Sequence, residues 1–219
     1  MQVKVVIDVE MCRVYSKGGV FPYQNEIIQI GAVKMDEDCS ILDSFSSFVR
    51  PRFGRIDRFI GKLTHISESD VSEAPELEEA LLQMMRWIGG DDVVFYSWSR
   101  TDLSQIRKEI PIKCGKCSEW DILTDPSKWI DYQEQFMRRL KTSRQMKLSE
   151  ALDLAELDVE GRLHDGLDDA YNTARMIAKL EKQKDYRTLI ERARAAEESH
   201  KPLTTSLEYL FRDLKVKSA

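Results

Sequence analysis

Residues Val3-Lys-Val-Val-Ile-Asp-Val-Glu10 form the most informative stretch of this 219-residue chain. Its β-branched, almost continuously apolar character is typical of a strand that is buried in the middle of a sheet. Two carboxylates, Asp8 and Glu10, stand at its end and are two residues apart. Because side chains two apart on a strand point to the same face, both can bind one or two cations together. The stretch therefore predicts a central strand that ends in an acidic pair.

The segments that follow predict an α/β fold with a mixed sheet flanked by helices. Residues 26–35 and 41–49 have strand patterns, so we expect an antiparallel meander with the first strand, and another strand is expected at 93–96. Apolar periodicity and stop signals predict helices over residues 72–88, 102–109, 129–140, 148–157 and 168–181. Strands followed by alternating strands and helices are typical of an α/β domain.

The composition changes beyond about Lys184, where Arg, Glu and Ala become frequent. We therefore expect a domain over residues 1–184 and a helical C-terminal extension over residues 185–219. After Pro202, residues 203–214 carry a helical apolar stripe. Such a stripe indicates that the helix face is buried but not which surface buries it, so the extension could pack on the domain, form a homodimer or dock a partner.

The charge balance limits how the chain can meet nucleic acid. Its net charge is −5 and its pI is about 5.4, which argues against a broad basic binding surface. A protein that holds a few nucleotides, with bound cations meeting the phosphates, can still be acidic. No apolar run approaches the roughly 20 residues of a membrane span, and no signal peptide is evident, so we expect a cytoplasmic protein. Cys114 and Cys117 lack a second metal-binding pair, which predicts a turn with free thiols.

Two further acidic elements follow predicted strands or loops. Asp102 begins a helix directly after the strand at 93–96. Asp169 lies in the first turn of another helix, five residues after His164. Each element has an ordinary explanation, since acids in first helical turns are favoured by the helix dipole or act as caps. With 38 acidic residues in the chain, an Asp-x-Glu pair also arises by chance. Their order and spacing together carry more weight than any one of them.

Together the three elements resemble the DEDDh-type 3′→5′ exonuclease superfamily, which includes ribonuclease T and polymerase proofreading exonucleases. That family has Asp-x-Glu on its first strand, an Asp opening a helix in mid-chain, and a His followed by an Asp near the end. All five positions are filled here, by Asp8, Glu10, Asp102, His164 and Asp169. Further similarity lies in residues 26–32, Arg50-Pro51, residues 63–66 and Ala74-Pro75, so the resemblance covers roughly residues 3–181.

The stretch Gly166-Leu-Asp-Asp-Ala170, with Trp129-Ile-Asp131 upstream, is most similar to one branch of this superfamily. That branch contains small-RNA- and histone-mRNA-trimming exoribonucleases and the bacterial sporulation inhibitor KapD. The chain has Ser99 and His65 where family members often have Gly, and Cys12 where they often have Thr. These departures leave the four carboxylates and the His in place.

The resemblance implies a ribonuclease H-like fold and a site that binds two Mg²⁺ or Mn²⁺ ions. Asp8 is expected to bridge both ions, while Glu10, Asp102 and Asp169 complete their coordination and His164 acts as general base. The resemblance also places the terminal nucleotide near Met11, Leu63 and Thr64, where Met11 and Leu63 would hold the base between them. Core packing explains these two apolar side chains equally well.

The predicted activity is hydrolysis of phosphodiester bonds at single-stranded 3′ ends, with RNA modestly preferred over DNA because of the branch resemblance. A non-catalytic module on the same fold, which binds nucleic acid or a protein, is one alternative. A DNA-restricted proofreading exonuclease is another.

Overall fold

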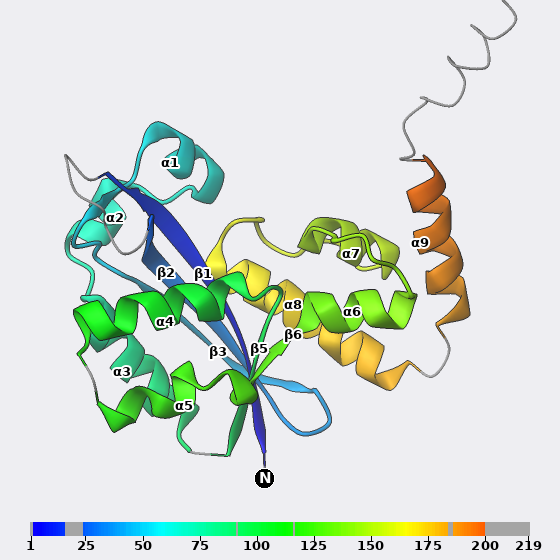
Figure 1. Ribbon diagram of the computed structural model, residues 1–219, viewed down its shortest axis with the longest axis horizontal. Helices are drawn as coiled ribbons and strands as arrows, with labels where there is room; N and C mark the ends of the chain where they lie inside the picture. The colour runs from blue at the N-terminus through cyan, green and yellow to red at the C-terminus, as the bar shows by residue number, and fades with distance from the viewer. Residues whose placement is uncertain (1, 16–23, 91, 116, 184–185, 200–219) are drawn as a thin grey trace, which may run out of the picture.

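A computed structural model describes residues 2–15, 24–90, 92–115, 117–183 and 186–199 (Figure 1). Within these residues six strands form one sheet in the order β3-β2-β1-β5-β6, with β4 pairing beside the end of β1. The strands are β1 (Val3–Val14), β2 (Asn25–Met35), β3 (Ile41–Phe48), β4 (Gly54–Arg55), β5 (Val93–Ser97) and β6 (Trp129–Asp131). β2 runs antiparallel to both of its neighbours, β1 and β3, whereas β5 and β6 run parallel to β1. The predicted mixed sheet and antiparallel meander are confirmed.

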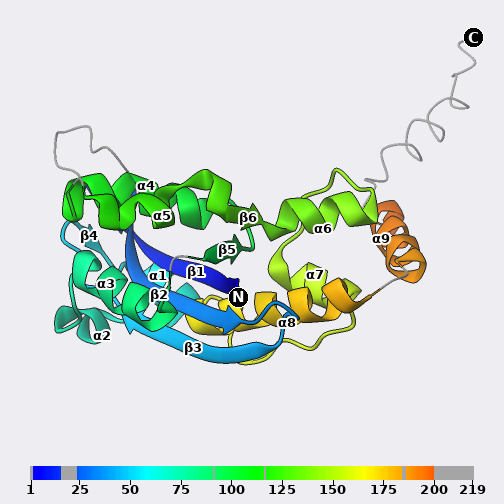
Figure 2. The same cartoon turned by 90° about the horizontal axis from the view of Figure 1, so that it is seen from below.

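Helices cover both faces of the sheet (Figure 2). They are α1 (Arg58–Thr64), α2 (Glu68–Ser72), α3 (Leu77–Ile88), α4 (Thr101–Lys113), α5 (Asp121–Thr124), α6 (Tyr132–Leu140), α7 (Leu148–Leu154), α8 (Gly166–Lys182) and α9 (Arg187–Ser199), with 3-10 turns η1 (Ser118–Trp120) and η2 (Pro126–Lys128). Val5, Ile7 and Val9 of β1 pack with α3 and α4, whereas Val6 packs with α8. Because side chains alternate along a strand, Asp8 and Glu10 lie on the α8 face with Val6.

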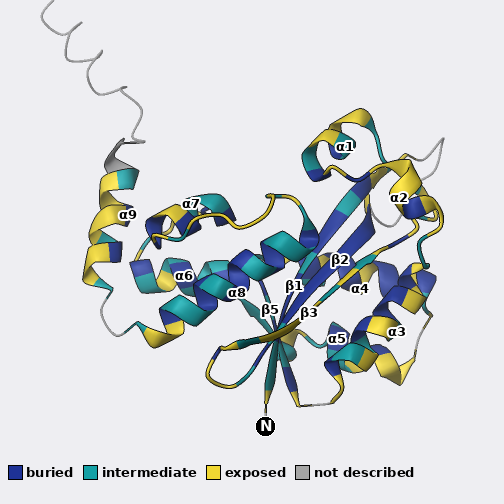
Figure 3. Ribbon diagram, turned by 180° about the vertical axis from the view of Figure 1, so that it is seen from behind, coloured by how far each residue is buried: buried dark blue, intermediate teal, exposed yellow. Residues whose placement is uncertain are grey.

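Buried residues concentrate in the middle strands, and β1 and β2 are dark along most of their length in Figure 3. β2 is buried at nearly every position, as expected for a strand covered on both faces. None of the helices in the described part of the chain has the length and apolar character that a membrane crossing requires. The expected compartment stays a prediction.

Five predicted boundaries are wrong, and two of them are helix ends, since α4 continues to Lys113 and α7 already ends at Leu154. β1 continues past Glu10 to Val14, because its last residues pair with both β2 and β4. The helix predicted from residue 72 begins at Leu77, since the carbonyl of Pro75 accepts a hydrogen bond from the backbone of Arg50 and residues 73–76 form a connection. Residues 129–131, predicted as the start of a helix, instead form the edge strand β6.

The C-terminal extension predicted over residues 185–219 is described as far as Ser199. Leu189 and Ala193 of α9 are buried in the same apolar cluster as α8, and Arg192 donates a 3.2 Å hydrogen bond to the carbonyl of Leu154. This part of the extension therefore packs on the helices of the domain. The apolar stripe predicted at residues 203–214 lies outside the described residues, and the boundary at residue 184 stays a prediction.

Candidate active site

A close contact between backbones brings the first turn of α8 onto the sheet. A Cβ added to Gly31 of β2 would lie 2.1 Å from the carbonyl carbon of Gly166, so a larger residue cannot stand there without displacing the helix. The side-chain oxygen of Gln29 accepts a 2.9 Å hydrogen bond from the backbone N–H of Gly166. The start of α8, with Asp169 in its first turn, is thereby held above the carboxylates of β1.

Hydrogen bonds to two carboxylates, Asp165 in the loop and Asp169 in the helix, hold the loop before α8 against the helix. Asp165 is the N-cap and accepts hydrogen bonds from the N–H groups of Leu167 and Asp168. The N–H of His164 donates a 2.9 Å hydrogen bond to Asp169 Oδ2. His164 has a left-handed backbone, with φ of 65°, and its side chain is exposed. The loop therefore places the imidazole next to the carboxylate of Asp169.

The predicted site residues meet from three elements. Ligand atoms of Glu10, His164 and Asp169 all lie within 4.8 Å of one another. Asp102, in the first turn of α4, is 5% exposed, and its Oδ1 accepts a 3.1 Å hydrogen bond from the N–H of Val9. Asp8 lies two residues before Glu10 on β1 and lines the same cleft as His164 and Asp169. The structure thus gathers four carboxylates around the middle of β1.

Burial and mutual repulsion raise the pKa values of these acids. Burial is the largest cause at Asp8, whose pKa is well above its usual value, with further increases from the charges of Asp102, Asp169 and Glu10. Burial raises the pKa of Glu10 to about 8, that of Asp102 to about 7 and that of Asp169 to about 6. Hydrogen bonds from Val9 to Asp102 and from His164 to Asp169 oppose these increases.

The residues present fit divalent cations. Asp169 Oδ1 is buried and has no hydrogen-bond partner among the described residues, which is costly unless a ligand meets it. The other acids lie close enough to repel one another, and a cation removes the part of their pKa increase that comes from this repulsion. Hard carboxylate oxygens select Mg²⁺ or Mn²⁺ rather than softer metals.

The cleft has a volume of about 530 Å³. Its lining consists of Asp8, Trp98, Ser99, Gln133, Gln145, Met146, Lys147, Leu148, Ser149, Leu163, His164 and Asp169. Burial, followed by the charge of Lys147, lowers the pKa of His164. A lowered pKa keeps the imidazole neutral near pH 7, so it can accept a proton.

The residues predicted to bind the terminal nucleotide lie on β1 and α1. Met11 is half-buried and packs partly against the α3–α4 side of the core, and Leu63 is half-buried on α1. Thr64 is 2% exposed, and its hydroxyl donates to the carbonyl of Ile60 and accepts from the N–H of Ile66. Their contact with a nucleotide stays a prediction.

Sequence reasoning missed the role of Gln29 in holding α8. A polar residue in an otherwise apolar strand was the signal that could have found it, because a buried amide needs a partner. Neither Cys114 nor Cys117 forms a disulfide bond.

Comparison with known proteins identifies the family. A family model described as Exonuclease, the RNase T family, matches residues 5–177. The chain belongs to this family. The DEDDh exonucleases are metal-dependent hydrolases, so the predicted family and enzyme class are confirmed.

Curated relatives of the RNase T family include 3′-5′ exoribonuclease 1 of Rattus norvegicus, 28% identical over 170 residues, which are 75% of this chain and 49% of that protein. A DNA polymerase III of the PolC type from Caldanaerobacter subterraneus is 31% identical over 176 residues, which are 80% of this chain and 11% of that protein. The chain therefore spans about half, or much less, of the length of these relatives.

Solved structures show the same fold. The nuclease domain of 3′hExo, a DEDDh family member bound to rAMP, matches with a TM-score of 0.70 and 23% identity, over 83% of this chain and 92% of that one. Exonuclease X in complex with 5′ overhanging duplex DNA matches with a TM-score of 0.55 and 20% identity, over 86% of this chain and 98% of that one. The predicted ribonuclease H-like architecture is confirmed.

Proposed function

We propose that this chain removes nucleotides from single-stranded 3′ ends and that RNA is its preferred substrate. The observation that carries the proposal is the meeting of Glu10, His164 and Asp169 within 4.8 Å, beside Asp8 and Asp102. An exposed imidazole next to buried acids suits hydrolysis better than binding alone, because a binding module has no need of a proton acceptor there.

Four carboxylates would hold the cations, namely Asp8, Glu10, Asp102 and Asp169. Bound Mg²⁺ or Mn²⁺ supplies an activated water and charge neutralisation at the departing 3′ oxygen. His164 accepts a proton from the water that attacks the terminal phosphate, and its exposed ring passes that proton to solvent. The bond between phosphorus and the 3′ oxygen breaks, and the departing oxygen takes up a proton from solvent. The products are a nucleoside 5′-monophosphate and a shortened strand with a free 3′ hydroxyl.

Met11, Leu63 and Thr64 are proposed to hold the terminal nucleotide. Met11 stands one residue beyond Glu10 on β1, and α1 carries the other two residues. A half-buried Met and a half-buried Leu offer an apolar surface to either face of a base. The buried Thr64 hydroxyl is already engaged by the carbonyl of Ile60 and the N–H of Ile66, so the backbone of Thr64 would be the group that meets the sugar.

The relatives support RNA over DNA. One is named as an exoribonuclease, and a matched structure concerns 3′-end specific recognition of histone mRNA stem-loop by 3′-exonuclease. Other relatives are DNA polymerases, and another matched structure holds duplex DNA. The proposal for RNA rests on the curated exoribonuclease, of which the match covers 49%, against 11% of the curated polymerase.

Matched 5′-labelled single-stranded RNA and DNA oligonucleotides test this function in Mn²⁺, Mg²⁺ or chelator. We expect a ladder that shortens from the 3′ end, is faster on RNA, and is abolished by chelator, by Asp8→Ala and by His164→Ala. Retained binding of both oligonucleotides without cleavage in either metal would instead favour the non-catalytic module. Cleavage of DNA alone would favour the DNA-restricted enzyme.

A further inference from the structure

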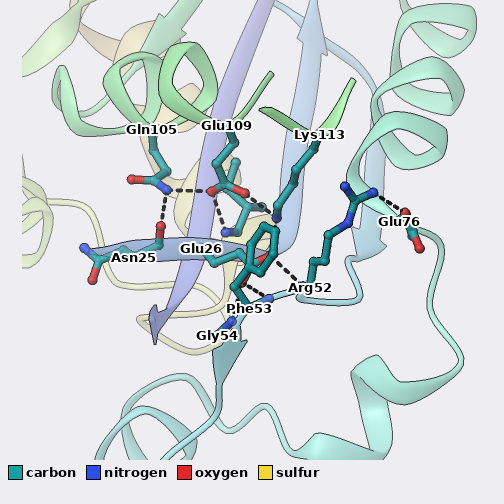
Figure 4. Close-up of polar contacts among 10 residues, drawn as sticks. Asn25, Glu26, Arg52, Phe53, Gly54, Glu76, Gln105, Glu109 and Lys113 are labelled. Atoms are coloured by element: carbon teal, nitrogen blue, oxygen red, sulfur yellow. Dashed lines mark hydrogen bonds and ion pairs between the residues drawn. The ribbon is translucent and has the colours of Figure 1, made fainter. Parts of the chain in front are cut away.

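A cluster of buried charges lies between β2 and α4 (Figure 4). Lys113 Nζ is 2.5 Å from Glu26 Oε1 and 2.5 Å from Glu109 Oε2, and the three side chains are at most 3% exposed. One ammonium cannot neutralise two carboxylates, and burial of charge opposes folding unless each group is fully bonded. Because its burial is costly, we expect this cluster to have a structural or functional role.

Glu26 holds a loop. Its carboxylate accepts hydrogen bonds from three consecutive backbone N–H groups, those of Arg52 at 2.6 Å, Phe53 at 2.9 Å and Gly54. A Cβ added to Gly54 would lie 2.4 Å from Cys12 Sγ and 3.0 Å from Glu26 Oε2, so only glycine lets the loop approach this closely. The path of residues 52–54 is therefore set by the carboxylate of Glu26.

Glu109 holds the beginning of β2 from the other side. Its Oε1 accepts a 2.8 Å hydrogen bond from the N–H of Ile27 and a 2.5 Å hydrogen bond from the amide of Gln105. The register of β1 and β2 shifts here, with Glu10 opposite Gln29 and Met11 opposite Ile27. A bulge of this kind redirects the side chains around it. The cluster therefore stabilises the bulge that lies opposite Glu10 and Met11.

The loop that Glu26 holds leads directly to α1. Gly54 and Arg55 form β4 and pair with the end of β1. Tyr15 at that end donates a 2.6 Å hydrogen bond to Asp57, the N-cap of α1, and the guanidinium of Arg13 lies 5.6 Å from the ring centre of Phe59. α1 stands beside the end of β1 in Figure 1. The loop over residues 52–54 therefore sets where α1 lies relative to β1.

We propose that Glu26 is a positioning residue for the 3′-terminal nucleotide, because through the loop over residues 52–54 it sets the separation between Met11 on β1 and Leu63 on α1. Lys113 holds its carboxylate in place, and Glu109 in turn pairs with Lys113. This inference rests on the proposed function. Glutamine at position 26 would offer one acceptor oxygen in place of two, and its amide N–H groups would face either the loop N–H groups or the ammonium of Lys113.

The first test compares Glu26→Gln with Glu76→Gln. In the wild type, the half-exposed carboxylate of Glu76 forms ion pairs with Arg50 and Arg52, which lie next to the loop that Glu26 holds. On a 5′-labelled RNA in saturating Mn²⁺, we expect Glu26→Gln to raise KM by about tenfold and to change kcat by less than about threefold. The variant loses binding that is equally strong for the substrate and the transition state, whereas the carboxylates of the active site are unchanged. Glu76→Gln should change both constants by less than about twofold. A fall in kcat at unchanged KM, or no change at all, would overturn the positioning role.

A wild-type chain that leaves both RNA and DNA intact would overturn the proposed function itself, and the positioning role with it. An active wild type with an unaffected Glu26→Gln variant overturns the positioning role alone. Gly54→Ala serves as a second variant, because it moves the loop without removing a charge, and it should also raise KM selectively. In the wild-type protein, the amide hydrogens of residues 52–54 should exchange as slowly as those of β2, and rapid exchange would contradict the inference.

Discussion

His164 owes its position to backbone geometry. Its φ of 65° is unusual for a residue with a side chain, and its N–H, not its ring, bonds Asp169. Removing the ring should therefore leave the loop and the carboxylate of Asp169 in place. This separation makes the general-base role of His164 testable without disturbing the acids.

We expect His164→Ala to lower kcat by about 10²- to 10⁴-fold, the usual contribution of a general base. The wild-type rate should fall as the pH drops below neutrality and the ring gains a proton, at a pH somewhat below the ordinary His range because burial lowers the pKa of His164. Steady-state rates across pH check this, and the variant should lose that acidic limb. Titration with Mn²⁺ is the control, because a variant that no longer binds the ion would identify His164 as a ligand instead.

At the scale of elements, the sequence predicted which segments carry the site, but not how they meet. The strand pattern of residues 3–9 and the acids in the first turns of α4 and α8 pointed to carboxylates that the structure brings close together. The extension of β1 to Val14 could not be predicted, because it depends on pairing with β4, a two-residue strand without a pattern of its own. The approach of α8 likewise depends on two glycines that are far apart in sequence.

Gly31→Ala tests the placement of α8. The added Cβ would meet backbone atoms of Gly166 and Leu167 at 2.1 to 2.2 Å, and backbone cannot rotate away as a side chain does. We expect a loss of about 1–3 kcal/mol in the free energy of unfolding, as for overpacked sites, and a large loss of nuclease activity as Asp169 moves away from Glu10. Urea unfolding and the oligonucleotide assay measure both.

Gly90→Ala is the matched control, since a Cβ added there has no atom within 4 Å among the residues that the structure describes, its chain neighbours apart. It should leave activity at the wild-type level. If Gly31→Ala kept full activity and stability, the close contact between β2 and α8 would not be what places Asp169.

At the scale of the whole molecule, α9 joins the C-terminal extension to the core. Deleting residues 186–219 uncovers the apolar cluster that Leu189 and Ala193 help to fill. We expect the shortened protein to fold with a lower melting temperature, because burying a Leu side chain contributes about 1.5–3 kcal/mol. Activity on short oligonucleotides should be retained if residues 1–184 form the exonuclease domain.

A chain that ends at Ser199 is the comparison for this deletion, because it keeps every contact of α9 that is described. Calorimetry of both proteins separates the contribution of α9 from that of the last 20 residues, 200–219. Equal melting temperatures for the two truncated chains would show that α9 contributes nothing to the stability of the domain.

The raised pKa values of the site acids also make the stability of the metal-free protein depend on pH. A carboxyl whose pKa is raised by folding binds more protons in the folded than in the unfolded state, so its contribution to stability is lost as pH rises. For Glu10 this window runs from its ordinary value, about 4.3, to its folded pKa of about 8. A cation that binds the ionised acids acts in the opposite direction, because it stabilises the folded state alone.

In chelator, we therefore expect the wild type to lose stability relative to Glu10→Gln as the pH rises from about 5 to about 8, because glutamine keeps the shape of the side chain but cannot ionise. Mn²⁺ should raise the melting temperature of the wild type more at the upper end of this range, where the acids release their protons to bind it. Scanning calorimetry in chelator and in Mn²⁺ measures both differences. Since the other ionisable groups are common to the two proteins, a constant difference between them across this range would mean that Glu10 does not carry a raised pKa, and that the site acids are not crowded in the absence of metal.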